Sequence, residues 1–438
     1  MARWQQWLVP PEVRDWSMGR EFIAGLANFL TAGYIIAVNP DILSTTGMDR
    51  HALISVTCYA SALGCFLMAL WPKVPVMMAP GMGLNAFFAF TLCGIHRVPW
   101  PTALGIVFLA GALFIGLTVG GLREAILRAI PLSLRLAIPA GIGLFIAFIG
   151  LQHMKLVIDH PATLVTLGPL RKELGLALVG LVVAFVLEAL RVRGSLLIVI
   201  LAITLIAIGA GWVERPSAWI TRPPSMAPVF LQMDVRDALR PIHWLPIFAF
   251  MYVALFDGLG TLTGIAYQAG LVRNGEIPRL GRMLMADAVG ATAGALMGTS
   301  TVTAYIESGA GVAAGGRTGW TALFTGLFFL TAPFFAGLIA VIPSYATAVA
   351  LVVVGIYMIQ HIREIDFTRW DEGAPAFLTI VLMPLTYSIA TGLCFGILSY
   401  LALVLLLRRW ERLSPTLVLI GLLSALYLYL STRGLAHA

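Results

Sequence analysis

Residues 72–88 read PKVPVMMAPGMGLNAFF and interrupt an apolar stretch that would otherwise predict one continuous helix. Three prolines and two glycines within the first twelve of these residues prevent such a helix. Helix can resume only near Leu84, and about ten helical residues at about 1.5 Å each cover roughly 15 Å, half of a bilayer's hydrocarbon core. The sequence therefore predicts extended chain followed by a half-helix, with Asn85 just inside its start.

A second interruption lies at the corresponding place in the other half of the chain, where residues 298–311 read GTSTVTAYIESGAG. The β-branched, hydroxyl-rich run 299–303 favours extended chain, and helix can begin near Ala304. A shift of 222 residues places Asn85 on Glu307, so each break carries one polar side chain. Paired interruptions of this kind indicate the binding site of a transporter. Non-helical backbone at this depth must line a cavity walled by protein.

The composition of the whole chain places it in a bilayer. Of 438 residues, 59% are hydrophobic and 11% are charged, against about 45–50% and about 25% in soluble domains. This excludes a cytosolic enzyme, a secreted disulfide scaffold and a transmembrane β-barrel. The four cysteines show no CxxC spacing and imply neither a disulfide nor a metal site. We expect no cofactor and no nucleic-acid partner, because the net charge of +7 is better explained by membrane orientation.

The apolar segments number fourteen, and the polar stretch 213–240 divides seven from seven. A fifteenth segment, 415–431, can span the membrane, lie in its interface or pack on the bundle, and the sequence leaves this open. The fourteen are 20–38, 51–71, 76–92, 102–120, 136–152, 174–190, 195–212, 244–268, 283–298, 302–314, 319–340, 344–360, 375–390 and 392–407.

The distribution of basic residues predicts the orientation of these segments. With the N-terminus in the cytoplasm, 18 of the 28 Lys and Arg residues fall on the cytoplasmic side. Because seven is odd, the second set of seven runs inverted relative to the first. The sequence thus predicts an all-α polytopic membrane protein of 14 transmembrane segments, built as two inverted seven-segment repeats with broken helices at segments 3 and 10. We expect it in the inner membrane of a bacterial-type cell.

Three acids lie well inside apolar segments: Asp257, Asp287 and Glu307. A carboxylate at the bilayer centre costs about 2.5–3.5 kcal/mol on insertion scales, so it is rarely there without a use. Asn85, Asp257 and Glu307 are the candidate substrate ligands, and Asp257, Glu307 and Asp287 the candidate proton carriers. The structural alternatives are a hydrogen-bonded internal acid and, for Asn85, a helix cap. A rival function is an intramembrane aspartyl protease with Asp257 and Asp287 as its dyad.

Four longer motifs resemble a known family. Together they resemble the adenine/guanine/hypoxanthine permeases, a branch of the nucleobase:cation symporter-2 (xanthine/uracil permease) family, over essentially the whole chain. The motifs are APGMGLNAFF at 79–88, GTSTVTAYIESGAGV at 298–312, GGRTG at 315–319 and PAFLTIVLMPLTYSI at 375–389.

The resemblance implies two inverted repeats that divide into a core domain, which carries the substrate, and a gate domain, which commonly forms a homodimer. It also implies that Asn85, Asp257 and Glu307 lie in the substrate region. The expected boundaries are 1–19 for a cytoplasmic N-terminus, 20–120 and 241–340 for the core, 121–212 and 341–408 for the gate, 213–240 for an external linker and 409–438 for a C-terminal tail.

The eighth segment departs from the family pattern, which has two acids three residues apart, followed by Thr. Ala254 stands in place of the first acid and Gly258 in place of the Thr. Ala27 and Asn28 likewise stand where two Thr are common. These departures leave uracil, xanthine or another flat heterocycle open as the substrate.

We expect a secondary active transporter that imports a purine nucleobase by proton symport. A carboxylate accepts N–H bonds from a purine edge, and an amide both donates and accepts. The chain carries no ATP-binding motif, so an ion gradient is the expected energy source. An anion carrier on the same fold is the alternative, and the lack of a Lys or Arg in the middle of the segments argues against it.

Overall fold

A computed structural model describes residues 6–120, 130–216, 218–272 and 277–436. Parts of five expected regions lie outside the described residues, namely 1–5 of the N-terminus, 121–129 of the gate, 217 of the linker, 273–276 of the core and 437–438 of the tail. The first half comprises α1 (Met18–Ala32), α2 (Ile35–Ser44), α3 (Arg50–Leu70), β1 (Met78–Pro80), α4 (Met82–Ala86), the π-helix η2 (Phe87–Ile95), α5 (Trp100–Val119), α7 (Leu132–His153), β2 (Val157–His160), β3 (Leu164–Leu167), α8 (Lys172–Ala189) and α9 (Ser195–Gly209).

The second half is likewise mainly helical. It comprises α10 (Val235–Ala238), η3 (Pro241–His243), α11 (Trp244–Gln268), α12 (Leu280–Met297), β4 (Val302–Ala304), α13 (Ser308–Ala313), α14 (Gly319–Thr331), η4 (Ala332–Phe335), α15 (Ala336–Ala340), α16 (Ser344–Ile359), η5 (Gln360–Glu364), α17 (Trp370–Leu385), α18 (Ile389–Leu406), η6 (Trp410–Arg412) and α19 (Pro415–Ala436).

Eight helices of the described chain are long and apolar enough to cross a membrane, and three further apolar helices are shorter. Each of the fifteen apolar segments overlaps one helix, successive helices, or a strand followed by short helices. The chain is therefore a multi-pass membrane protein. The count of fourteen crossings and the inverted repeat stay predictions. The fifteenth segment forms α19, which packs along α18.

The two interrupted segments pair with each other. β1 and β4 run antiparallel, with Met78 opposite Ala304 and Pro80 opposite Val302. The Gly81 N–H extends the pairing by donating to the Thr301 carbonyl at 2.9 Å. This pairing satisfies backbone groups that would be costly to leave unpaired inside a membrane.

The half-helices begin at different residues from those predicted. The first starts at Met82, two residues before Leu84, because Gly81 already takes the extended capping position. The second starts at Ser308 and not near Ala304. Its later start has a physical reason, since Ala304 is held in the β1–β4 ladder.

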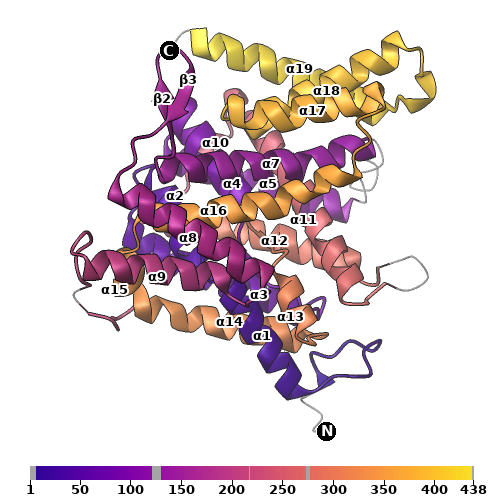
Figure 1. The fold of residues 1–438 in the computed structure, drawn as a ribbon. Helices are drawn as coiled ribbons and strands as arrows, with labels where there is room; N and C mark the ends of the chain where they lie inside the picture. The colour runs from indigo at the N-terminus through magenta and orange to yellow at the C-terminus, as the bar shows by residue number, and fades with distance from the viewer. Residues whose placement is uncertain (1–5, 121–129, 217, 273–276, 437–438) are drawn as a thin grey trace.

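Helices from the two halves of the sequence pack together. In Figure 1, α17, α18 and α19 lie side by side at one end of the molecule, and α1 and α14 lie together at the other. Contacts join α1, α3 and α5 to α12, α13 and α14, and they join α7, α8 and α9 to α16. Each seven-segment half therefore contributes to both groups of helices. The division into core and gate domains with the boundaries given above stays a prediction.

Candidate functional site

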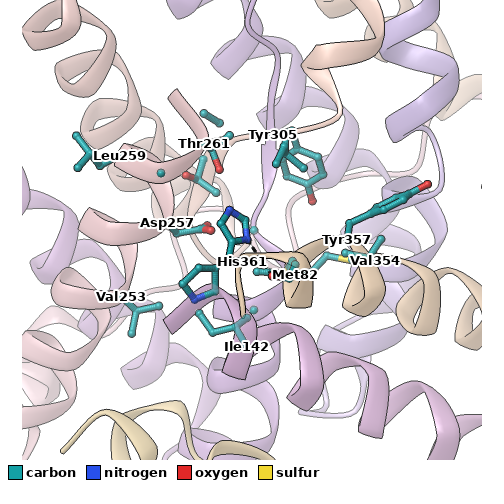
Figure 2. Close-up of a pocket in the computed structure, with 18 of the residues that line it drawn as sticks. Met82, Ile142, Val253, Asp257, Leu259, Thr261, Tyr305, Val354, Tyr357 and His361 are labelled. Atoms are coloured by element: carbon teal, nitrogen blue, oxygen red, sulfur yellow. Dashed lines mark hydrogen bonds between the residues drawn. The ribbon is translucent and has the colours of Figure 1, made fainter. Parts of the chain in front are cut away.

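A cavity of about 270 Å³ lies where the two strands end and the half-helices begin. Both broken segments contribute to its wall, together with α7, α11 and α16 (Figure 2). A volume near 300 Å³ is at the lower end of the range of small-molecule sites and suits one small ligand. The polar and charged side chains in the wall are Tyr34, Arg135, Asp257, Thr261, Thr263, Thr303, Tyr305, Glu307, Tyr357 and His361.

Glu307 lies at the turn between β4 and α13, as the capping residue of that half-helix. Its side chain is buried and borders the cavity. The Tyr34 hydroxyl, at the junction of α1 and α2, donates a 2.5 Å hydrogen bond to the Glu307 carboxylate. The helix break therefore presents an acid to the cavity, and a buried tyrosine fixes the position of this acid.

Asp257 reaches the cavity from the middle of α11. Thr261 follows one helical turn later on the same wall, as positions four residues apart share a helix face. Figure 2 shows the Asp257 carboxylate directed into the cavity, between Thr261 and Val253 along the helix. The cavity thus has carboxylates from two elements, α11 and the second broken segment.

Asp287 lies on α12 behind the cavity and holds β4 in place. Its carboxylate accepts hydrogen bonds from the Thr303 hydroxyl at 3.0 Å and from the Ala304 N–H at 2.9 Å. Thr303 is itself part of the cavity wall, whereas Asp287 is not among the described residues that line it. A Cβ added at Gly258 on α11 would collide with the Asp287 carboxylate. The absence of a side chain at position 258 thus lets α11 approach this acid.

Asn85 is also behind the wall, fully buried in a network of amides and hydroxyls. Its side chain donates to the Asn39 carbonyl oxygen at 2.6 Å and accepts from the Ser300 hydroxyl. Asn39 in turn donates to the Thr57 hydroxyl at 2.7 Å. The network ties the two broken segments to α2 and α3. Among the described residues it is Leu84, the neighbour of Asn85, that borders the cavity.

Of the ten polar or charged residues in the described wall, sequence reasoning found Asp257 and Glu307 and missed the other eight, among them Tyr34, Arg135, Tyr357 and His361. Arg135 sits in the first turn of α7, and its Nε is buried without a hydrogen-bond partner among the residues that the structure describes. The His361 Nδ1 lies 2.9 Å from the Met358 carbonyl oxygen. The sequence places Arg135 directly before the apolar segment 136–152 and counts it with the cytoplasmic charges, so nothing in the sequence indicated that it contributes to the wall.

Acidic and histidine side chains, which this wall contains, are also common protein ligands of metal ions. In the described part of the chain, no group of three or more His, Cys, Asp or Glu side chains is arranged to hold a metal ion. The wall contains two acids, one arginine, one histidine and several hydroxyls. Such a set can match a ligand edge that carries both donors and acceptors.

Comparisons with known proteins agree with this architecture. The sequence model of the Permease family, named for xanthine and uracil permeases, matches residues 19–395. The guanine/hypoxanthine permease PbuG of Bacillus subtilis is 40% identical, over 94% of this chain and 96% of the relative. The adenine permease AdeQ of Escherichia coli is 39% identical, over 94% and 93%.

Solved structures show the fold. The transmembrane domain of the cyanobacterium bicarbonate transporter BicA matches with a TM-score of 0.66 at 16% identity, over 88% of this chain and 98% of that domain. The murine anion transporter Slc26a9 in its inward-facing state matches with a TM-score of 0.63 at 11% identity, over 91% and 70%. At sequence identities this low, the two matches show only that the fold is shared.

The family and its relatives are permeases, so the chain is a transporter and the protease alternative is wrong. The family match covers residues 19–395. It therefore includes both broken segments and all the described residues of the cavity wall. The chain belongs to the xanthine/uracil permease family, alongside relatives named adenine and guanine/hypoxanthine permeases.

Proposed function

We propose that this protein carries a purine nucleobase across the membrane by proton symport. One observation carries the proposal: Asp257 and Glu307 border a single small cavity at the point where two helices are broken. Relatives at 38–40% identity are named for the transport of adenine, guanine and hypoxanthine, which supports a purine as the ligand.

The geometry suits recognition of a flat heterocycle by its edge. A carboxylate such as Glu307 accepts N–H bonds from the ring, and charge-assisted bonds of this type are roughly twice as strong as neutral ones. Thr261 and Thr303 offer hydroxyls that both donate and accept. The apolar side chains Leu84, Ile142 and Val253 cover the ring faces. Asp257 and Glu307 are therefore the proposed direct ligands.

In this proposal Asn85 and Asp287 do not contact the ligand and instead hold the parts of the site in position. Asn85 holds the two broken segments together through Asn39 and Ser300. Asp287 fixes β4, and with it the Thr303 hydroxyl in the wall. Both roles act on the shape of the site and not on the ligand directly.

Proton coupling rests on the same two acids. A carboxylate inside a membrane is more stable when it is neutral, so each acid can take up a proton with the substrate and release it afterwards. We place the protein in a cell inner membrane with its N-terminus in the cytoplasm, and we propose a homodimer. Site-directed labelling at the N-terminus and mass measurement in detergent test these two points.

The test of the function is uptake by the purified protein in proteoliposomes. We expect radiolabelled adenine, guanine or hypoxanthine to enter faster as the external pH falls from about 8 to 6, and a protonophore to abolish accumulation. Uracil and xanthine are the competitors to include. Arg135 in the wall is the observation that favours an anion carrier as the second candidate, and bicarbonate-driven or chloride-driven exchange without purine uptake would replace our proposal by that one.

A further inference from the structure

Arg135 brings a group to the cavity wall that can only donate hydrogen bonds. An arginine has five N–H donors and no acceptor. Arg135 lies in the first turn of α7, and Leu136, Pro139 and Ile142 continue the wall along this helix. Its Nε is buried and has no hydrogen-bond partner among the described residues. A buried donor without a partner is destabilising, and an acceptor atom on a ligand would remove this cost.

The hydroxyl groups of the wall, in contrast, mostly donate to the protein itself. Four of the six hydroxyls in the described wall are engaged in this way: Tyr34 donates to Glu307 at 2.5 Å, Thr303 to Asp287 at 3.0 Å, Thr263 to the Leu259 carbonyl at 2.8 Å, and Tyr305 to the Pro80 carbonyl. A hydroxyl whose proton is engaged presents only lone pairs to a ligand. The other two, of Thr261 and Tyr357, are not obligate donors, because a hydroxyl can also accept.

His361 adds a further acceptor. Its Nδ1 lies 2.9 Å from the Met358 carbonyl oxygen. Because a carbonyl only accepts, Nδ1 carries the proton, and Nε2 of the neutral ring is then an acceptor. The carboxylates of Asp257 and Glu307 are acceptors as well. The described side chains of the wall therefore combine many acceptors with one charged donor, Arg135.

This pattern distinguishes between two kinds of purine. In guanine and hypoxanthine, N7 and the oxygen at position 6 are neighbouring acceptors, and the N1–H beside them is a donor. Adenine has a donor amino group at position 6 and an acceptor at N1. Arginine pairs with O6 and N7 of guanine, whereas the amides of Asn and Gln pair with N6 and N7 of adenine. The predicted amide, Asn85, lies behind the wall and is bonded to Asn39 and Ser300, so the wall has the arginine and not the amide.

The donor and the acids belong to different parts of the fold. Arg135 is on α7, in the predicted gate domain, whereas Asp257 on α11 and Glu307 before α13 are in the predicted core domain. A ligand that lies between them meets donors on one side and acceptors on the other. A purine with an oxygen at position 6 presents the matching groups, O6 and N1–H, at adjacent positions of its edge.

We propose that Arg135 determines the specificity of the site and that the substrate is a 6-oxopurine of the guanine and hypoxanthine type. The inference rests on the proposed function, since it assumes that a purine binds in this cavity. Arg135 donates to O6 and N7, and Asp257 or Glu307 accepts the N1–H. Adenine reverses both groups, so that the arginine would face an amino group and the carboxylate would face a lone pair.

The experiment compares affinities for purines that differ at position 6. Equilibrium binding to the purified full-length protein is measured at a pH of about 7.5 with hypoxanthine, guanine, adenine and purine without a substituent at position 6. The variants are Arg135→Gln, which supplies the amide that suits adenine, and Arg135→Lys, which keeps the charge but loses the planar fork. Arg193→Gln is the matched control, because Arg193 is exposed after α8 and is not among the described residues of the wall.

We expect the wild type to bind hypoxanthine and guanine at least about tenfold more tightly than adenine, within the discrimination that a bidentate base contact gives. Arg135→Gln should lower the ratio of hypoxanthine affinity to adenine affinity by at least about tenfold, Arg135→Lys should lower it less, and Arg193→Gln should keep the wild-type ratio. A wild-type ratio in Arg135→Gln would overturn the proposal.

The wild type alone provides a second test, which holds even if Arg135→Gln does not fold. Equal affinities for hypoxanthine and for purine without a substituent at position 6 would show that no donor reads the oxygen, and would overturn the proposal. A wild type that prefers adenine would also overturn it and would leave the proposed function intact. A wild type that binds none of the four purines would instead overturn the proposed function.

Discussion

Tyr34 and Glu307 are 273 positions apart in sequence, and a 2.5 Å hydrogen bond joins their buried side chains at the wall of the cavity. Tyr34 lies between α1 and α2, and Glu307 caps the half-helix α13. The bond thus connects the first predicted segment to the second broken segment. Because Tyr34 occupies one direction of the carboxylate, the lone pairs that remain on Glu307 are available to a ligand in the cavity.

The first prediction concerns this pair. Glu307→Gln keeps the shape of the side chain but replaces one acceptor oxygen by a donor, so we expect a normally folded protein whose affinity for the purine falls by at least tenfold. Tyr34→Phe leaves the acid but removes its positioning bond, and we expect a smaller loss of about three- to tenfold. Equilibrium binding of hypoxanthine to purified protein measures both. Wild-type affinity in Glu307→Gln would place the ligand elsewhere.

The second prediction concerns Asp287 and the strand that it holds. Asp287→Ala leaves the Ala304 N–H and the Thr303 hydroxyl without this acceptor, and an unsatisfied buried donor costs about 1–3 kcal/mol. We expect a lower melting temperature in detergent and reduced transport. Asp287→Asn keeps one acceptor oxygen and should lie between Asp287→Ala and the wild type. If Asp287→Ala melted at the wild-type temperature but lost only the pH dependence of uptake, Asp287 would be a proton carrier.

The sequence was informative where a side chain or a backbone break carries a local cost. Asp257 and Glu307 stand out because a charge in an apolar segment is expensive, and both border the cavity. The prolines at 72, 75 and 80 likewise mark the first break. The sequence also predicted the positions of most helices, because a membrane-spanning segment is defined by the length of its apolar run.

What the sequence did not show depends on contacts between distant segments. The pairing of β1 with β4 joins residues more than 200 positions apart, and no local pattern specifies its register. Asn85 and Glu307 correspond by repeat position, yet one points into an amide network and the other borders the cavity. Tyr34 and Tyr357 gave no signal, because a tyrosine in an apolar helix is common and cheap.

The third prediction uses the close approach of α11 to Asp287. Gly258→Ala brings a methyl group onto the Asp287 carboxylate, so either the carboxylate or the helix must shift. We expect transport to fall by about tenfold and the protein to melt at a lower temperature, because β4 loses its alignment with the cavity. Gly264→Ala is the matched control on the same helix, since a Cβ there meets no heavy atom within 4 Å and Gly264 is not among the described residues that line the cavity.

This control also tests for a general effect of glycine replacement. Alanine favours a helix over glycine by about 0.8–1.0 kcal/mol, so Gly264→Ala should be as stable as the wild type or more stable. An equal loss of transport in both variants would show that α11 needs flexible positions, and that the contact between Gly258 and Asp287 is not the cause.

The last prediction concerns a contact that joins α2 to α16. The Thr347 hydroxyl donates to the Asp41 carboxylate at 2.7 Å, and Asp41 also forms an ion pair with Arg50 at 3.5 Å. Arg50 itself donates to the Ile342 carbonyl at 2.9 Å. α2 belongs to the predicted core domain and α16 to the predicted gate domain. These bonds therefore hold the two domains together where α2 meets α16, and we call this contact the α2–α16 edge.

Thr347→Val removes the hydroxyl while keeping the volume of the side chain, so the Asp41 carboxylate loses a partner across the contact. A hydrogen bond to a charged group contributes about 1.5–3 kcal/mol, which corresponds to an opening of the edge that is at least about tenfold more frequent. We expect faster amide hydrogen exchange in α2 and at the start of α16, measured by mass spectrometry. Thr347→Ser keeps the hydroxyl and should exchange like the wild type, because the bond to Asp41 is preserved. Unchanged exchange in Thr347→Val would mean that Arg50 and the surrounding apolar contacts close this edge without the hydroxyl, and the pair would then be a consequence of closure and not its cause.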